Sequence, residues 1–255
     1  MRDSETSKRR LGCSGDNTRM KRKEALGSVL AGAGLLLGAT AKARAATAAA
    51  IAPGAPLAVP KNGRIRVAFV ISNNANVIDL AGPWETFQDV MSPSGDMPFE
   101  LSTIAETTQI VETTGGLRIE PTYSFDAIPA MPNIVVVGAQ SNHSEQFMEM
   151  LRFVQGKVDI TMSVCTGAFK LAKSGILDGK SATTHHEYYD SFAKQFPKVT
   201  LVRGERFVDN GTIVTAGGLT SGITAALHVV ARYYGVPHAE RTAAYMEFVP
   251  TARQA

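Results

Sequence analysis

One cysteine stands in the body of this 255-residue chain, within the stretch "DITMSVCTGAFKLAKSG". Cys165 comes where an apolar run of strand length ends and a helical pattern begins at Thr166 and Gly167. A strand, a small-residue turn and a helix are typical of a nucleophile that a sharp turn exposes. Because helix amides favour negative charge there, we expect a thiol with a lowered pKa that acts as a nucleophile. The alternative is a small core residue that happens to follow a strand.

An upstream carboxylate is the second candidate for chemistry. Asp79 lies in "VIDLAGPWETF", just before a helix that we expect from about Leu80. A carboxylate near a thiol can serve as a general base. Asp79 is equally suited to cap that helix, and the two roles are compatible. Trp84 follows on the same helix, where it lines a pocket or simply packs on the helix face.

The sequence offers no pattern for a metal or a nucleotide. His185, His186 and Glu187 are consecutive, so they cannot share one face of a helix. No H-E-x-x-H or C-x-x-C occurs, and Gly217-Gly218 does not form a dinucleotide fingerprint. We therefore expect no metal and no cofactor.

Strand and helix patterns alternate through most of the chain, which predicts an α/β fold with a mostly parallel sheet and helices on both faces. Apolar runs predict strands, Gly115-Gly116 predicts a hairpin, and Asn210-Gly211 predicts a type I′ turn. Ser144 caps a predicted helix and Gly175 closes the helix that follows Cys165. The main predicted strands cover residues 64–72, 99–106, 133–139 and 158–165, and the main predicted helices cover 144–157, 166–177, 219–235 and 238–248.

Open parallel sheets bind ligands beyond the carboxyl ends of their strands. Three such places stand out, namely the ends of the runs 133–139 and 158–165 and the loop after 64–72. We therefore expect Cys165 and Asp79 to lie near one another at this edge of the sheet.

A family resemblance follows from three motifs. "VIDLAGPWETF", "VCTGAFKLAKSGILDGKSATTHH" and "GTIVTAGGLTSGITAALHVV" together resemble the ThiJ/PfpI superfamily over about residues 64–250. Within it the chain is most similar to isonitrile hydratases and to the amino-terminal domains of AraC-type regulators. The resemblance implies a flavodoxin-like α/β sandwich that forms a homodimer. Because no DNA-binding helical domain follows before Ala255, the stand-alone hydratase-like branch is favoured and nucleic acid is not an expected partner.

The resemblance also assigns residues one at a time. Cys165 matches the family nucleophile and Asp79 the acidic residue that faces it in isonitrile hydratases. Thr166 matches the residue after the nucleophile, although it is also a plausible first residue of the helix. The proteases of the superfamily place a histidine there, so proteolysis is disfavoured. Amidotransferase activity is disfavoured too, because no downstream His-x-Glu stands in a suitable context.

Three further residues are expected to contact substrate. The amides of Gly138 and Ala139, with that of Thr166, are candidates to hold an anionic intermediate, although relatives often carry glycine at the second position. His185 lies where the family often has a histidine near the pocket, but a direct catalytic role for it is not expected.

The resemblance implies a cofactor-free lyase that hydrates an isonitrile to an N-substituted formamide. A compact, uncharged isonitrile needs no basic clamp, and the sequence shows none. The alternatives are a sensor module that binds a small molecule without turnover, and another cysteine-dependent activity of the superfamily, glyoxalase-like or amidase-like.

The first 45 residues are predicted to be an export signal, of twin-arginine-like or Sec type. "RMKRKEALGSVLAGAGLLLGATAKARA" has a basic start, an uncharged Gly/Ala-rich run and an A-x-A site. Residues 46–63 form a predicted linker and 251–255 a tail. Residues 1–60 hold ten Lys or Arg and four Asp or Glu, whereas residues 61–255 hold 16 Lys or Arg and 19 Asp or Glu. The excess of positive charge therefore lies in the first sixty residues. We expect a periplasmic or secreted protein without stable membrane insertion after cleavage. The alternatives are an uncleaved anchor and a cytoplasmic location.

Overall fold

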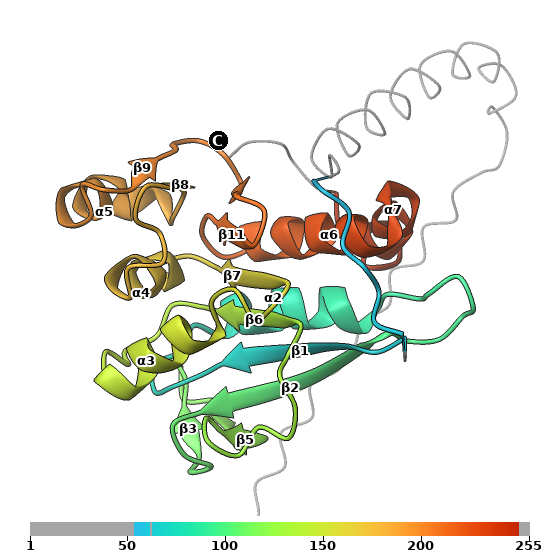
Figure 1. Ribbon diagram of the computed structural model, residues 1–255, viewed down its shortest axis with the longest axis horizontal. Coiled ribbons are helices and arrows are strands. Elements are labelled where there is room, and N and C mark those ends of the chain that lie inside the picture. The colour runs from blue at the N-terminus through green and yellow to red at the C-terminus, as the bar shows by residue number, and fades with distance from the viewer. Residues whose placement is uncertain (1–53, 62, 250–255) are drawn as a thin grey trace, which may run out of the picture. The chain divides into compact units, whose positions relative to one another are not determined.

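The computed structural model describes residues 54–61 and 63–249. Their main feature is a seven-stranded sheet in the order β10-β11-β7-β6-β1-β2-β5 (Figure 1). Neighbouring strands run parallel except β10, which is antiparallel to β11. The predicted mostly parallel sheet is therefore confirmed. The strands are β1 (Ile65–Val70), β2 (Phe99–Ala105), β5 (Tyr123–Ser124), β6 (Ile134–Val137), β7 (Ile160–Ser163), β10 (Phe207–Asp209) and β11 (Ile213–Ala216).

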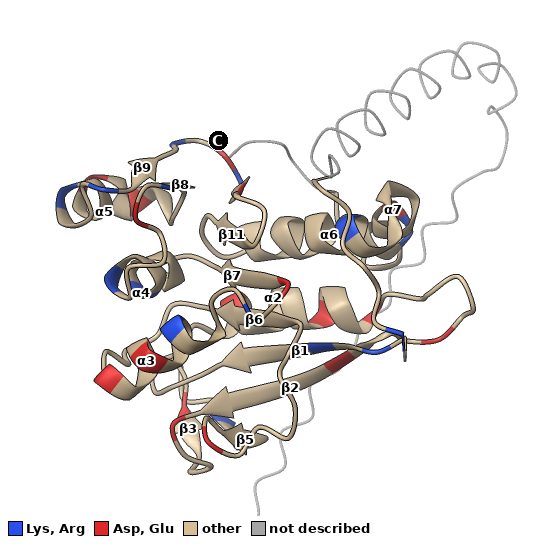
Figure 2. Ribbon diagram, viewed as in Figure 1, with Lys and Arg blue, Asp and Glu red and all other residues tan. Residues whose placement is uncertain are grey.

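Helices cover both faces of the sheet because successive strand residues point to opposite sides. Val67 and Phe69 of β1 pack in one core with α2, α6 and α7, whereas Ala68 and Val70 pack in a second core with α3, α4 and α5. The central strands carry almost no charged side chains (Figure 2). The helices are α2 (Val77–Gln88), α3 (Glu145–Val154), α4 (Gly167–Lys173), α5 (Tyr189–Gln195), α6 (Ser221–Tyr234) and α7 (Val236–Tyr245).

The order of the strands reverses beside β1. The chain passes from β1 to β2 on one side and then returns to β6 on the other side. Ligands bind at such a switch point in open α/β sheets, outside the carboxyl ends of the strands. The segments that follow β1, β6, β7 and β11 all meet there, and they hold the residues of the candidate site.

The predicted helix ends agree in part with the structure. The Ser144 hydroxyl accepts a hydrogen bond from the Phe147 amide and begins α3, as predicted. Gly175 follows α4 with a φ of +87°, which confirms it as the helix terminator. Helix α2, however, begins at Val77 and is capped by Asn76. Asp79 is therefore not the cap, because the chain turns into the helix three residues earlier than expected.

Short elements join the main sheet. Strands β3 (Val111–Glu112) and β4 (Arg118–Ile119) form the predicted hairpin around Gly115-Gly116. Strands β8 (Ser181–Ala182) and β9 (Thr200–Leu201) form a separate parallel pair, and a short 3₁₀ helix, η1, covers His186–Tyr188.

The turn at Asn210-Gly211 differs from the type I′ prediction. Gly211 has a φ of +87°, but Asn210 is not among the residues with positive φ, which a type I′ turn requires at both positions. The Asn210 side chain donates to the Ser181 carbonyl at 2.7 Å and accepts from the Ser181 amide at 3.3 Å. The turn at Asn210-Gly211 thus departs from the type I′ conformation that the Asn-Gly pair favours, and the Asn210 side chain contacts Ser181 instead.

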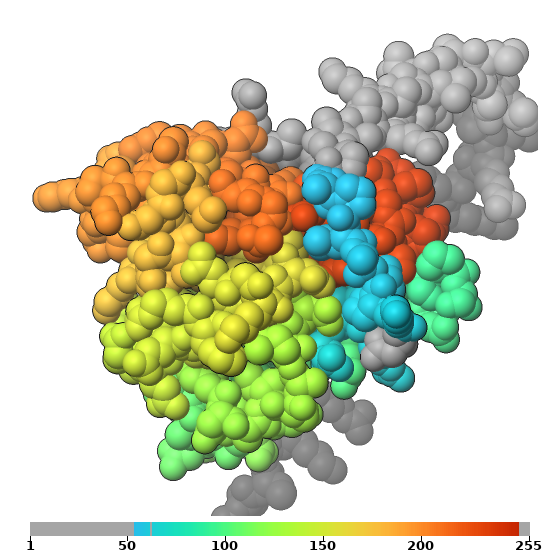
Figure 3. Space-filling view, in the orientation of Figure 1, coloured from blue at the N-terminus to red at the C-terminus, as the bar shows by residue number. Residues whose placement is uncertain are grey.

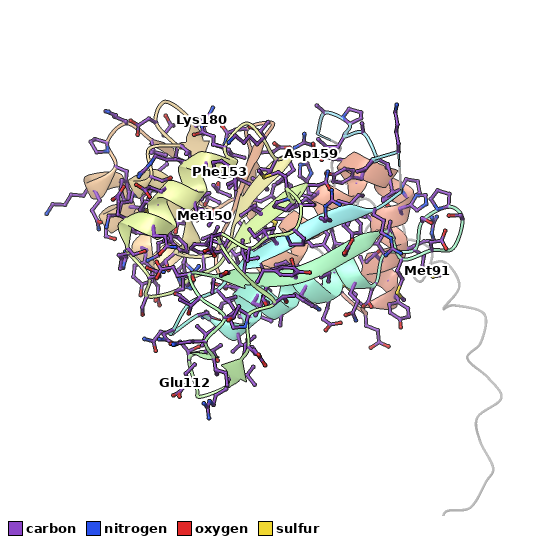
Figure 4. All side chains as sticks on the ribbon, turned by 60° about the horizontal axis from the view of Figure 1, so that its bottom comes forward. Met91, Glu112, Met150, Phe153, Asp159 and Lys180 are labelled. Carbon is purple, nitrogen blue, oxygen red and sulfur yellow. The ribbon has the colours of Figure 1, made fainter. Side chains whose placement is uncertain are left out.

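Part of the predicted linker lies on the domain. The Leu57 amide donates to the Arg232 carbonyl at 2.8 Å, and Arg232 Nε donates to the Ala55 carbonyl at 2.8 Å. Figure 3 shows this segment in cyan beside the red helices α6 and α7. The predicted export signal and tail fall outside the described residues. Within residues 54–61 and 63–249 no helix has the length and apolar character needed to cross a membrane.

Candidate active site

Cys165 occupies the sharp turn between β7 and α4. Its φ is +58°, a left-handed conformation that a side chain with a Cβ rarely adopts. The Cys165 amide donates to the Gly217 carbonyl at 2.8 Å, and the Thr184 hydroxyl donates to the Cys165 carbonyl at 2.9 Å. A backbone carbonyl on one side and a threonine hydroxyl on the other thus hold the strained turn, as expected where strain is kept at a functional site. The predicted strand–turn–helix geometry is present.

Gly167 explains how tightly this turn closes. A Cβ at this position would lie 2.0 Å from the Val137 carbonyl oxygen, so any side chain would collide with the end of β6. Helix α4 can begin this close to β6 only with glycine there. Thr166 begins the helix without a side-chain capping bond, so its hydroxyl is not used in the cap.

Asp79 is completely buried and faces Cys165. Its Oδ2 accepts a hydrogen bond from the Ala139 amide at 3.0 Å. Cys165 and the Leu219 amide lie close enough to lower the pKa of the carboxyl group. The second oxygen, Oδ1, is nevertheless buried without a hydrogen bond of standard geometry. Burial outweighs these neighbours and raises the pKa of Asp79 from 3.8 to about 6.

The thiol of Cys165 differs from the expectation of a lowered pKa. Burial and the negative charge of Asp79 raise its pKa to about 12, and the amides of Thr166 and Leu219 only partly oppose them. The helix terminus does supply an amide to the sulfur, as the sequence suggested. It is outweighed because Cys165 is only 6% exposed and faces a carboxylate. Cys165 is therefore a thiol beside its own base near neutral pH.

Leu219 is a site residue that the sequence analysis missed. Its φ is +53°, and its amide faces both Asp79 and Cys165. The signal in the sequence was the pair Gly217-Gly218 at the end of a strand and before a helix. The pair does not form a nucleotide-binding pattern, but it ends the strand where the chain turns to bring the Leu219 amide to the site.

The two residues after β6 play different parts from those expected. Ala139 donates its amide to Asp79, so this amide orients the base and is already engaged. A Cβ at Gly138 would lie 2.8 Å from the Asp79 Cβ, so Gly138 allows the carboxylate to approach the strand end. The predicted oxyanion contact through Gly138, Ala139 and Thr166 stays a prediction.

Trp84 and His185 contact parts of the structure that surround the reacting pair. The Trp84 ring packs 5.1 Å from Phe69, centroid to centroid, as part of the core around α2. The half-buried His185 begins η1, where its Nδ1 accepts from the Glu187 amide. A Cβ at Gly218 would lie 2.1 Å from the His185 ring, so the ring borders the segment that carries Leu219.

The arrangement suits covalent chemistry on a small electrophilic group. A buried thiol and a carboxylate of near-neutral pKa can exchange a proton without a histidine. A cavity of about 10 Å³ borders Asp79, Gly138 and Ala139, enough for one water molecule at most. Among residues 54–61 and 63–249 no three His, Cys, Asp or Glu side chains gather as metal ligands.

Comparison with known families tests the resemblance read from the motifs. A family model described as the DJ-1/PfpI family matches residues 65–232. The chain belongs to this family. The ThiJ/PfpI resemblance is thereby confirmed, and the matched segment contains both Asp79 and Cys165.

The curated proteins that this chain is similar to include an enzyme and a transcriptional regulator. An isonitrile hydratase of Pseudomonas putida is 29% identical over 191 residues, which cover 73% of this chain and 79% of that protein. The transcriptional regulator GbdR of Pseudomonas aeruginosa is 27% identical over 188 residues. That match covers 72% of this chain but spans only half the length of the regulator.

Solved structures confirm the family fold. A ThiJ/PfpI family protein from Pseudomonas syringae aligns with a TM-score of 0.60 at 23% identity, over 73% of this chain and 76% of that one. DJ-1beta of Drosophila melanogaster aligns with a TM-score of 0.61 at 16% identity, over 72% of this chain and 98% of that one. The flavodoxin-like α/β architecture expected from the sequence is the fold of this family.

Proposed function

We propose that this protein is a cofactor-free, cysteine-dependent hydro-lyase that hydrates an isonitrile to an N-substituted formamide. The observation that carries the proposal is the buried pair of Cys165 and Asp79, in which the carboxyl Oδ1 has no standard hydrogen bond. Similarity to an isonitrile hydratase along most of both chains supports the choice of substrate class.

The first step forms the covalent adduct. The sulfur of Cys165 bonds to the terminal carbon of the isonitrile while Asp79 accepts the thiol proton and passes it to that carbon. The product is a thioimidate, R–N=CH–S–Cys165. Because burial and Asp79 raise the pKa of the thiol to about 12, the thiolate is scarcely populated beforehand, and Asp79 takes the proton as the C–S bond forms.

The second step releases the formamide. Asp79 accepts a proton from a water molecule as the oxygen bonds to the thioimidate carbon, and passes this proton to the nitrogen. The tetrahedral adduct then collapses to the carbonyl as the C–S bond breaks, and its hydroxyl proton passes through Asp79 to the leaving sulfur. The sum is isonitrile plus water giving R–NH–CHO. The Thr166 and Leu219 amides stabilise negative charge on the sulfur as it leaves.

The test uses the full chain with a simple alkyl isonitrile and follows the formamide by chromatography. We expect more formamide molecules than protein chains, and none above background from Cys165→Ala. Cys13→Ala, which removes the other cysteine of the sequence, is the matched control and should retain activity. An intact chain that forms no formamide would overturn the hydratase proposal.

A sensor module is the second candidate, because the regulator GbdR matches this chain over about half of its own length. A sensor would bind the small molecule without multiple turnovers. The same experiment separates the two, since stoichiometric binding without product favours the sensor. Methylglyoxal consumption by the same preparation would instead favour the glyoxalase-like alternative.

Two further proposals concern the whole protein. We propose a homodimer, which sedimentation of the full chain tests directly.

We also propose export with cleavage after Ala45, because a basic segment, an uncharged segment and an A-x-A site follow one another in the order found in export signals. Mass spectrometry of the amino terminus after expression would show an uncleaved leader if this is wrong.

A further inference from the structure

A groove of about 310 Å³ adjoins the candidate active site on the side of α4. Its walls come from Gln140 after β6, from Thr166 and Lys170 of the α4 segment, and from the η1–α5 segment that carries Tyr188 and Gln195. Thr166 follows Cys165 directly. Gln140 also borders the small cavity beside Asp79. The groove therefore adjoins the turn that carries the nucleophile, on the side of α4.

A buried cation lies in this groove. Lys170 is only 3% exposed, yet no carboxylate pairs with its ammonium group within the described part of the chain. Its Nζ lies 3.0 Å from Nδ1 and 3.1 Å from Nε2 of His143. Burial and then the charge of nearby Lys173 lower the pKa of Lys170 to about 8. Such a charge is costly without an anion to balance it.

The His143 ring does not supply that balance. Burial, Lys170 and Lys173 all lower its pKa, so it is neutral near pH 7 and offers a single acceptor nitrogen. Lys170 has three N–H donors, of which one imidazole satisfies one. The remaining donors suit a carboxylate, which accepts strong charge-assisted hydrogen bonds.

Helix geometry sets the distance between Lys170 and Thr166, the residue that follows the nucleophile. Thr166 and Lys170 are four residues apart, so they lie on the same face of α4, one turn of about 5.4 Å from each other. Phe169 and Tyr188 meet edge to face beside them, with ring centroids 6.2 Å apart, and offer an apolar surface. A ligand that reaches from Cys165 to Lys170 therefore has a short apolar body and one charged end.

We propose that the natural substrates carry a carboxylate that Lys170 binds in this groove, a few carbon atoms from the group that reacts with Cys165. This inference rests on the proposed hydratase function for the identity of the reacting group, an isonitrile. It changes the expectation that the substrate is uncharged and needs no cationic partner. A single unbalanced ammonium matches one negative charge, which favours a carboxylate over a phosphate.

The test compares an acid with its neutral ester on the full chain. 4-Isocyanobutanoate and its methyl ester share the same reacting group and chain length. We expect kcat/KM for the acid to exceed that for the ester by about tenfold, mainly through KM, because a charge-assisted hydrogen bond is made only by the acid. Equal values, or a preference for the ester, would overturn the inference without any variant.

Two lysine variants locate the effect. Lys170→Met keeps a long side chain in a buried position, and we expect it to bring the acid-to-ester ratio to about one. Lys173→Met removes an exposed lysine from the same helix and should keep the tenfold ratio. An unchanged ratio in folded Lys170→Met, judged by its thermal unfolding, would contradict the assignment of Lys170.

A binding measurement separates this inference from the proposed activity. Calorimetry with 4-formamidobutanoate and neutral N-butylformamide needs no turnover. Tighter binding of the acid by about tenfold, lost in Lys170→Met, would support the carboxylate groove even if no isonitrile is hydrated. Hydration of neutral isonitriles without this preference would support the hydratase alone and overturn the groove. Equal displacement by inorganic phosphate at constant ionic strength would show a general anion site and overturn the carboxylate assignment.

Discussion

Two carboxylates are withdrawn from solvent in this domain, and their surroundings are opposite. Asp209 in β10 accepts from His228 Nε2 at 2.7 Å, from the Gly211 amide at 2.7 Å and from Arg232 Nη1 at 3.3 Å. Burial alone would raise the pKa of Asp209, but these three partners reverse the effect and lower it. Asp79 is more deeply buried, has no cationic partner within the part of the chain that the structure describes, and has a pKa raised to about 6.

The difference separates a structural carboxylate from a reactive one. Asp209 is stabilised as an anion, and its cluster also holds the segment around Ala55 through Arg232. Asp79 is a poorly stabilised anion that gains from taking a proton, which is the property of a general base. Strain and desolvation are concentrated around Cys165 and Asp79, whereas β10 and α6 hold a charge-balanced cluster.

The largest expected effect is on turnover by Asp79→Asn. The amide keeps the shape and the Ala139 contact but cannot accept the thiol proton, so formamide production should fall by about 10²–10⁴-fold. Asp178→Asn, at an exposed ion pair with Lys198, is the matched control and should keep the parental rate. An Asp79→Asn rate close to that of the parent would show that Asp79 is not the base.

Asp209→Asn should act on stability instead. Removal of this charge leaves Arg232 and His228 without their anion, and breaking a nearly buried pair lowers the free energy of unfolding by about 3 kcal/mol. Chemical denaturation at pH 7 measures the change. Wild-type stability in this variant would mean that the cluster contributes little and would remove the contrast with Asp79.

Asp79→Asn should raise the free energy of unfolding, whereas Asp209→Asn should lower it. The pKa of Asp79 is higher in the folded chain, about 6 against an ordinary 3.8, so the carboxyl group costs stability as pH rises through 6. The variant should gain up to about 3 kcal/mol at pH 8. The gain should disappear near pH 4, where the carboxyl group is protonated in the folded state. A gain that does not depend on pH would contradict this origin.

The smallest effect concerns the strained turn at Cys165. Glycine adopts a φ of +58° without the steric cost that a Cβ brings. Cys165→Gly should therefore be more stable than Cys165→Ala by about 1 kcal/mol, although both lose the nucleophile. Comparison of the two variants by thermal unfolding isolates the backbone. A less stable glycine variant would show that Cβ packing outweighs the strain.

Local sequence patterns were sufficient for the strands, most helices and the Cys165 turn. The apolar runs and the small residues after Cys165 predicted their own conformations, since these depend on near neighbours and on the period of burial. Local signals were weaker at Asn210, whose turn accompanies a side-chain contact with Ser181. They were also weaker at the start of α2, where Asn76 caps the helix and Asp79 is left inside it.

The sequence by itself determined the alternation of strands and helices, the nucleophile's position at a strand end and the family to which the chain belongs. Only the tertiary structure decided the charge states. Whether a helix terminus lowers the pKa of Cys165 depends on how much water remains and on which charge faces it. Burial beside Asp79 raises the pKa, while Leu219 joins the neighbourhood from a segment that the linear order does not connect with it.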